Sequence, residues 1–284
     1  SFDLNVLRRL QFTSAAIPFM ERPDLGAYLK RWGVRVLAND PLQSTWTRSV
    51  SRISNTAERL SSDDVNIVLD DAYVPGYRLQ NPALMNWFSE TDSWWFDNVR
   101  RNIDSLGSPV LRAVASTIAL SVGDYVFSFR DDTRELRQPL SSVFRRLWST
   151  FPEPCDNGQN NPSTNKNADD FIAETPSELM FLRLPPSHAQ GMRTYLGRLA
   201  WREEWIRGGN DFWDDLETNI RGKLGAATET QSQYLHLLEE TLQRASHMRT
   251  WAIAHVEDGF IQTQDIVATI GRIRRVDTIF TKDF

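Results

Sequence analysis

Strand-like and helix-like segments alternate over the first sixty residues, and this order limits the chain to a small set of folds. The apolar runs at 11–19 and 34–38 have the composition of short buried strands. Residues 25–32, with Asp24 as the expected N-cap, and residues 45–60 show apolar side chains at helical spacing. Because strands that alternate with helices usually lie side by side in one direction, we expect a parallel sheet.

The next hundred residues are predicted to form a separate, mainly helical region. Apolar side chains recur at helical spacing over 95–106, with Asp92 as the expected N-cap, and again over 111–125. Residues 152–167 are polar, rich in Asn and Pro, and without periodicity, which is typical of an exposed loop.

The remainder of the chain returns to strand-like and helix-like segments. In order, the predicted elements are a strand at 179–182, a long helical stretch at 190–246 with breaks near 208–209 and 222–225, a strand at 249–255, a helix at 263–270 and a strand at 276–280. We therefore expect residues 1–60 and 163–284 to form one α/β domain, interrupted by a helical insertion at 61–162.

Composition excludes some classes of site. Cys155 is the only cysteine and the four histidines have no metal-binding spacing, so neither an internal disulfide nor a cysteine-based zinc site is expected. No signal peptide and no run of about 18 apolar residues is visible, so we expect a cytoplasmic protein without a membrane partner. The net charge of −5 disfavours a wholly basic nucleic-acid binder. The 28 Arg against 4 Lys could reflect genome composition or forked contacts to phosphate and base edges.

Four short segments, in a fixed order, carry a further pattern. They are IPFMERP at 17–23 with Asn39-Asp40 after the next strand, NKNADDFI at 165–172, LPPS at 184–187 and HVEDGFI at 255–261. In this order and context they resemble the DNA adenine methylase family, which transfers a methyl group from S-adenosylmethionine to the N6 atom of adenine. The resemblance implies a Rossmann-like methyltransferase sheet with a helical insertion.

The resemblance also implies positions for the cofactor S-adenosylmethionine. Pro18, Phe19 and Met20 form the first strand-to-helix turn, where the family binds this cofactor. Asp40 stands where an acid at the end of the second strand accepts ribose hydroxyls, although Asn39-Asp40 can equally be a turn with a helix cap. Asn167 replaces an Asp that faces the cofactor's adenine in the family.

The sequence departs from the family where the chemistry is done. Glu21 and Pro23 replace glycines at the first turn, where a nucleotide approaches the backbone closely, so weaker cofactor binding is expected. The family's Asp-Pro-Pro-Tyr has become a turn in which Leu184 and Ser187 flank Pro185 and Pro186.

Each of the two catalytic substitutions removes a specific contribution to methyl transfer. Leu184 accepts no hydrogen bond from the adenine amine, and losing such a group typically costs on the order of 10²–10⁴ in rate. Ser187 offers no aromatic face to a flipped base, and base stacking contributes about 1–3 kcal/mol. A buried Leu184 is expected to pack against Phe19 or Met20, so that side chains close the former cofactor cavity.

Three functional hypotheses follow from these departures. The first is an inactive relative of DNA adenine methylases that binds DNA or a partner protein, such as an active methyltransferase subunit. The alternative is an active S-adenosylmethionine-dependent DNA methyltransferase with an altered site. The third is a structural subunit that binds neither ligand nor DNA.

Arginines near the end of the helical region are the candidate DNA-binding residues. In the family, the analogous region helps to read the target sequence, and here it holds Arg134, Arg137 and Arg145. On one face, they would dominate affinity by neutralising phosphates despite the net charge of −5. The alternative is a salt-bridged surface, because Asp132 and Glu135 lie among them.

Overall fold

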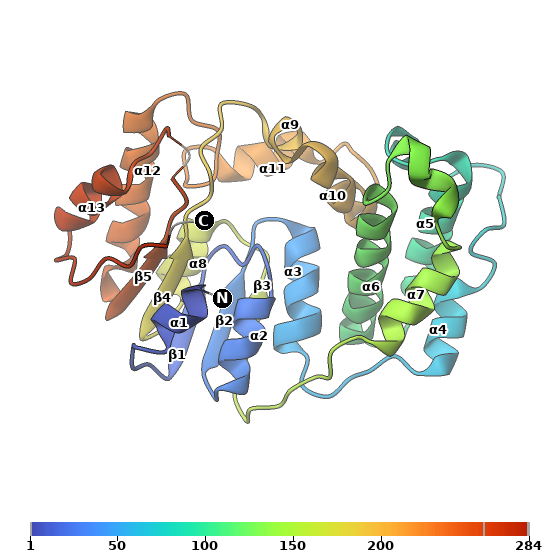
Figure 1. Cartoon of the computed structure of the whole chain (residues 1–284), viewed down its shortest axis with the longest axis horizontal. Coiled ribbons are helices and arrows are strands. Elements are labelled where there is room, and N and C mark those ends of the chain that lie inside the picture. The colour runs from blue at the N-terminus through green and yellow to red at the C-terminus, as the bar shows by residue number, and fades with distance from the viewer. Residues whose placement is uncertain (1, 258, 283–284) are drawn as a thin grey trace.

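The chain folds into a parallel sheet covered by helices, with a helical region beside it (Figure 1). The computed structural model describes residues 2–257 and 259–282. Among these residues, five parallel strands form one sheet in the order β3-β2-β1-β4-β5. The strands are β1 (Ser14–Ile17), β2 (Arg35–Asn39), β3 (Ser163–Thr164), β4 (Leu179–Arg183) and β5 (Thr250–Ala254). The predicted α/β fold with a parallel sheet is therefore confirmed.

The strand order reverses direction at the centre of the sheet. From β1 the chain moves outward through β2 to β3, and it then returns to the other side of β1 to form β4 and β5. Ala15 and Ala16 of β1 pair with Leu179 and Met180 of β4. In open parallel sheets, ligands bind beyond the carboxyl ends of the two strands at such a reversal.

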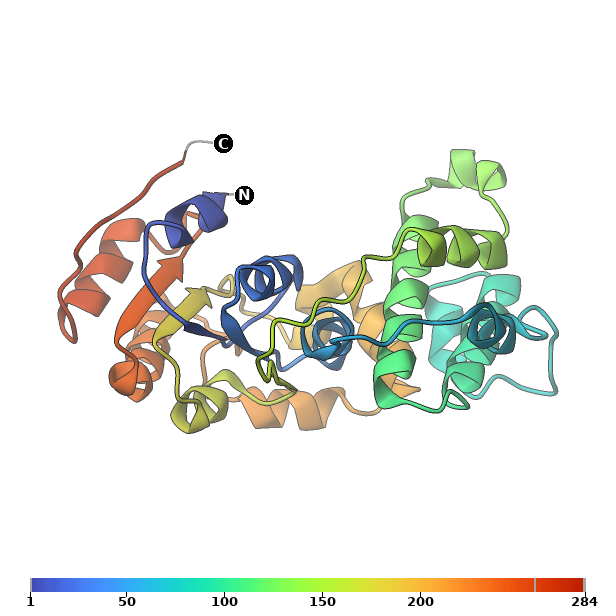
Figure 2. The same ribbon diagram turned by 90° about the horizontal axis from the view of Figure 1, so that it is seen from below.

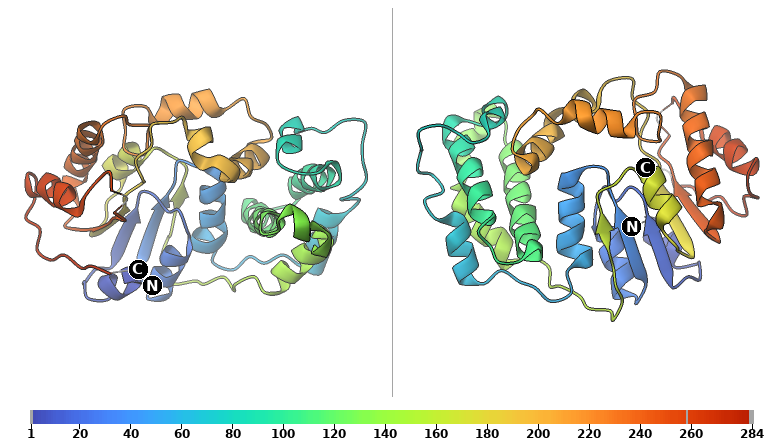
Figure 3. Two further views of the ribbon diagram at one scale, coloured as in Figure 1. Left: turned by 45° about the horizontal axis from the view of Figure 1, so that its top comes forward. Right: turned by 180° about the vertical axis from the view of Figure 1, so that it is seen from behind.

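Helices cover the sheet and build the helical region. Around the sheet lie α1 (Phe2–Leu7), α2 (Asp24–Arg31), α3 (Gln43–Ser49), α8 (Ala168–Glu174), α12 (Gln231–Arg244) and α13 (Thr263–Gly271). The helical region contains α4 (Ser62–Leu69), α5 (Glu90–Ile103), α6 (Pro109–Phe127) and α7 (Leu140–Ser149). Between β4 and α12, α9 (Met192–Leu196), α10 (Ala200–Arg207) and α11 (Trp213–Ile220) extend from the sheet to the helical region (Figure 3).

The helical region has its own apolar core, and α10 contributes to it. Trp201 and Trp205 of α10 are buried in the same cluster as Trp95 and Phe96 of α5. Gly123 of α6 allows this approach, since a Cβ there would stand 2.2 Å from the Trp201 ring. The core of the helical region is thus not made by residues 61–162 alone.

Short turns accompany the longer helices. They are a π-helical turn η1 (Val50–Ser54) and the 3-10 turns η2 (Pro82–Asn86), η3 (Asp131–Leu136), η4 (Gly197–Leu199) and η5 (Ala245–His247). One helix, α6, is long and apolar enough to span a membrane by length and composition, but more than half of it is buried inside this fold.

Several predicted boundaries are wrong, for local reasons. The helix predicted to reach residue 60 ends at Ser54, because the Asn55 side chain accepts the backbone N–H groups of Ala57 and Glu58 and turns the chain away. Ser89 caps α5 by accepting the N–H of Asp92, so Asp92 is not the N-cap.

Two further boundary predictions fail at the start of α2 and at the end of the chain. Pro23 precedes α2 and Asp24 is its first residue, without a side-chain capping bond. Residues 276–280 lie outside the sheet, and the apolar side chains of Ile279 and Phe280 stay exposed, so they provide no buried face for a strand.

Candidate functional site at the ends of β1 and β4

The turn after β1 holds a residue in a strained conformation. Glu21 has φ of +47°, in the left-handed region that disfavours side chains and suits glycine. Two bonds hold this turn: the Met20 N–H donates to the Asn39 carbonyl at 3.0 Å, and the Glu21 N–H donates to Asp40 Oδ2 at 3.1 Å. The backbone therefore adopts a glycine-type conformation where this sequence has Glu21.

Asp40, at the end of β2, is buried and joins two turns. Its Oδ2 accepts the Glu21 N–H, and its Oδ1 accepts the Leu42 N–H at 2.9 Å. Burial raises the pKa of Asp40 from 3.8 to about 7, because desolvation outweighs the hydrogen bonds from nearby backbone N–H groups, and the nearby Glu203 carboxylate raises it further. Both carboxyl oxygens thus bind backbone N–H groups of this chain, at the position expected to bind ribose.

Asn39 and Asn167, the neighbouring polar candidates, also make internal contacts. The Asn39 Nδ2 donates to the carbonyls of Pro18 and Lys166 at 3.0 and 2.9 Å, which ties the β1 turn to the chain after β3. Asn167 is the N-cap of α8, and its Oδ1 accepts the N–H of Asp170 at 2.9 Å. The residue expected to face a cofactor therefore caps a helix.

The turn after β4 is packed rather than open. Leu184 is 6% exposed and belongs to an apolar cluster against which Phe19 packs, whereas Met20 belongs to the cluster on the other face of the sheet. The Leu184 N–H donates to the Ala254 carbonyl of β5 at 2.9 Å. The expected burial of Leu184 among apolar side chains is confirmed, and Phe19 packs against the same cluster.

A later segment of the chain covers both turns. Gly225 has φ of +94°, and a Cβ there would stand 3.3 Å from the Phe19 ring and 3.8 Å from Pro185. The Tyr234 hydroxyl of α12 donates to the Pro185 carbonyl at 2.7 Å. These contacts pack the segment from Gly225 to Tyr234 against both turns. We call residues 18–21, Asp40 and residues 184–187 the β1–β4 site.

Ser187 and Pro186 lie at the outer edge of the β1–β4 site. Ser187 is half-buried and Pro186 is exposed. The next residue, His188, stacks on Tyr195 of α9 with ring centroids 4.1 Å apart, and its Nε2 lies 3.3 Å from the Gly225 carbonyl. The loop after the Pro-Pro turn is thus tied to the covering segment.

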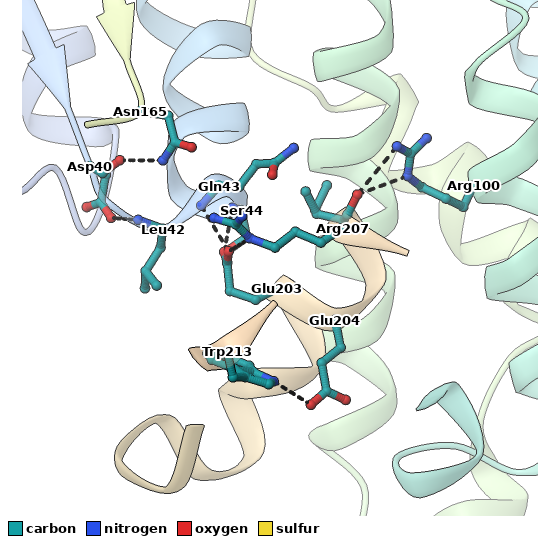
Figure 4. A network of polar contacts seen from close by, with 11 residues as sticks. Asp40, Leu42, Gln43, Ser44, Arg100, Asn165, Glu203, Glu204, Arg207 and Trp213 are labelled. Carbon is teal, nitrogen blue, oxygen red and sulfur yellow. Dashed lines mark hydrogen bonds and ion pairs between the residues drawn. The ribbon is translucent and has the colours of Figure 1, made fainter. Parts of the chain in front are cut away.

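Two buried glutamates of α10 anchor the site to the rest of the fold (Figure 4). The Glu203 carboxylate accepts the N–H groups of Gln43 and Ser44 at the start of α3, at 3.0 and 2.6 Å, and also the Arg207 Nε at 2.9 Å. Glu203 therefore supplies the N-terminal acceptor for α3 that Leu42, its N-cap residue, cannot provide.

Glu204 binds indole donors on the other side of α10. Its carboxylate accepts Trp87 Nε1 at 2.6 Å and Trp213 Nε1 at 3.0 Å, and it pairs with Arg193 at 2.7 Å. Sequence reasoning found neither glutamate, because their partners are far away in the sequence and leave no local pattern.

The three candidate arginines are in different environments. Arg137 forms an ion pair with Asp92 at 3.0 Å, and both side chains are largely buried, so Arg137 does not offer a free charge to DNA. Arg134 is exposed, and its guanidinium makes no ion pair with any of the acids whose side chains the structure describes, which do not include Asp131. Arg145 is exposed and donates to Asn66 of α4 at 2.9 Å.

Other arginines of this stretch are also exposed. Arg130 pairs loosely with Asp132 at 3.4 Å, and Arg146 donates to Gln138 while lying over the Tyr125 ring. The η3 turn and α7, which carry this group, lie on the front of the helical region in Figure 1. Asp258, part of the predicted turn after β5, lies outside the described residues.

The two clearest cavities of the described surface lie in the helical region and near α10, not at the β1–β4 site. Their volumes are about 750 and 390 Å³. The first is lined by residues 76–80 with Pro82, Trp94 and Arg101, and the second by residues near Phe127 at the end of α6 together with residues 198–199 and 201–202. In the described part of the chain, no three His, Cys, Asp or Glu side chains lie close enough to hold a metal ion. Comparisons with protein-family models, curated proteins and solved structures gave no match.

Proposed function

We propose that this chain is a methyltransferase-like protein that does not transfer methyl groups and that binds nucleic acid through its helical region. The observation that carries the first part is the filled β1–β4 site, where Leu184, Phe19 and Gly225 occupy the approach to a nucleotide cofactor. The strand order β3-β2-β1-β4-β5, shared with dinucleotide-binding sheets, supports a common ancestry with cofactor-binding proteins.

The chemistry of the site supports loss of catalysis. Methylation of the adenine amine needs an acceptor that draws hydrogen bonds from the poorly nucleophilic nitrogen, and Leu184 has none. S-adenosylmethionine needs an open turn and ribose acceptors, but Glu21 adds a side chain at the turn and both Asp40 oxygens already bind N–H groups. The residues present therefore do not fit this cofactor.

The case for nucleic-acid binding rests on a local group of arginines. Residues 61–162 contain 9 Arg and 14 Asp or Glu, so their formal charge is −5 and the region as a whole does not attract phosphates. Arg134 and Arg145 are exposed and unpaired with acids, which leaves their charges available. Binding by a few arginines on a negative surface should be weak, and log K should fall with log [salt] by only about 0.9 for each phosphate that they neutralise.

Two measurements test the two parts. Calorimetry with S-adenosylmethionine is expected to show no binding, and micromolar binding would restore the hypothesis of an active enzyme. For DNA, we expect the Arg134→Ala/Arg145→Ala double variant to weaken duplex binding. The slope of log K against log [salt] should also become shallower, by up to about 2. The charge-matched control is Arg31→Ala/Arg221→Ala, two exposed positions of the α/β part. Equal binding by both double variants would refute the assignment.

A further inference from the structure

A loop at the far end of the helical region is fixed at both ends by one helix. From α5, Asn98 Nδ2 donates to the carbonyls of Ala72 and Val74 at 3.0 and 2.9 Å. The Asp97 carboxylate accepts the N–H groups of Gln80 and Asn81 at 2.8 and 2.9 Å. Figures 1 and 2 show this loop between α4 and η2 at the end of the molecule opposite the sheet. Its tip is thus held in place over α5.

The tip borders an open hollow that includes two aromatic side chains. The cavity of about 750 Å³ is lined by Tyr77 and Trp94, among others. Gly76 lies beside Trp94, since a Cβ there would stand 3.4 Å from Trp94 Cζ3 and 3.5 Å from its Cη2. Tyr77 is completely exposed, so its ring is free to contact a ligand. The volume lies within the range of about 300–1,000 Å³ that small-molecule sites occupy.

The charges of the hollow are positive, within a region that is negative as a whole. Arg78 and Arg101 line it, and none of the lining residues is an acid. Arg101 donates to Asn98 Oδ1 at 2.9 Å, and Arg78 makes no ion pair in the part of the chain that the structure describes. Below the loop, the Asp97 carboxylate already binds two backbone N–H groups.

We propose that this hollow binds a nucleobase together with its phosphate. Tyr77 and Trp94 supply flat faces on which any base can stack, and Arg78 and Arg101 supply charge-assisted hydrogen bonds to phosphate oxygens. The inference deepens the proposed nucleic-acid binding, on which it rests, by naming unpaired nucleotides as the ligand. The exposed position of Tyr77 suits a single strand that passes over the loop tip.

The test uses the full chain and two probes, a fluorescein-labelled oligothymidylate of twelve nucleotides and thymidine monophosphate. At low salt, Tyr77→Ala and Arg78→Ala should each weaken binding of the oligonucleotide by roughly 5- to 100-fold, the range expected for one stacked base or one charged contact. Both residues are exposed, so the variants should fold normally. The matched controls are Tyr28→Ala and Arg31→Ala on α2, which are also exposed and should leave binding unchanged.

Each outcome decides the inference. Binding of both probes would identify a single nucleotide as the ligand, binding of the oligonucleotide alone would identify a strand, and both results support the site. No oligonucleotide binding by the parent, or binding that Tyr77→Ala and Arg78→Ala leave unchanged, overturns it. The duplex assay with Arg134→Ala/Arg145→Ala is separate, so failure of the arginine assignment is distinguishable from failure of this site.

Discussion

Replacing Leu184 with Asp tests whether the β1–β4 site is filled. The change removes a buried apolar side chain, which costs about 2–5 kcal/mol by comparison with Leu-to-Ala substitutions in cores. It also places a carboxyl in an apolar cluster. Asp40, which lies in the same site and has two N–H donors, still has its pKa raised to about 7. The pKa of a carboxyl at position 184, which has no such donors, should be raised at least as far.

The added cost of the charge can be calculated from this comparison. A pKa of about 7 against an ordinary 3.8 is a difference of about 3 units, or about 4 kcal/mol when the group is ionised. Because the folded pKa is raised, the Leu184→Asp protein is least affected below about pH 4, and the extra loss grows as the pH rises towards 7. Leu184→Ala has no such group, so its loss of stability should not follow this pH dependence.

The assay is urea unfolding, followed by circular dichroism, of the parent, Leu184→Ala, Leu184→Asn and Leu184→Asp at pH 4.5 and pH 8. Differences between variants cancel the titration of Asp40, which all four proteins share. We expect the difference in free energy of unfolding between Leu184→Asp and Leu184→Ala to increase by roughly 3–4 kcal/mol from pH 4.5 to pH 8. If this difference is the same at both pH values, position 184 is accessible to water and the β1–β4 site is not filled. Methyl transfer to DNA by Leu184→Asp would show that the rest of a catalytic site is intact.

Three other changes test neighbouring contacts. Because the folded-state pKa of Asp40 is raised, the parent should lose stability as the pH rises from about 4 to about 7. Asp40→Asn should remove this pH dependence, which is measured as the melting temperature against pH. Glu21→Gly should stabilise the protein by about 1 kcal/mol in urea unfolding, because it relieves a positive φ, whereas Glu21→Ala should not; equal effects would argue against strain. Glu203→Ala should cost about 3–5 kcal/mol and increase hydrogen exchange at the Gln43 and Ser44 amides, and normal protection there would contradict its capping role.

The parallel sheet could be predicted from the sequence, because short apolar strands alternated with segments of helical period. The positions of both turns of the β1–β4 site followed from the strand ends, and so did the apolar packing of Leu184. The predicted start of α5 was wrong because Ser89 and Asp92, three positions apart, can both cap a helix. In the structure Ser89 is the N-cap, and its hydroxyl accepts the N–H of Asp92. The Ser-x-x-Asp spacing is a signal that could have identified Ser89.

Long-range pairs account for what the sequence could not reveal. Arg137 was expected to face DNA, but Asp92 of α5, 45 residues earlier, neutralises it. Glu203 meets the start of α3 from about 160 residues away. Such pairs depend on how the helical region and the sheet are placed together, and neither period nor composition encodes that placement.

The insertion of α10 into the helical core has a consequence for folding during synthesis. Residues 61–162 leave the ribosome before Trp201 and Trp205 are made, yet these two indoles complete the core formed by α5 and α6. The nascent helical region therefore exposes an apolar surface, next to Gly123, until about forty more residues have emerged. At about 5–20 residues per second this interval lasts several seconds, during which the unfinished core is open to aggregation or to a chaperone.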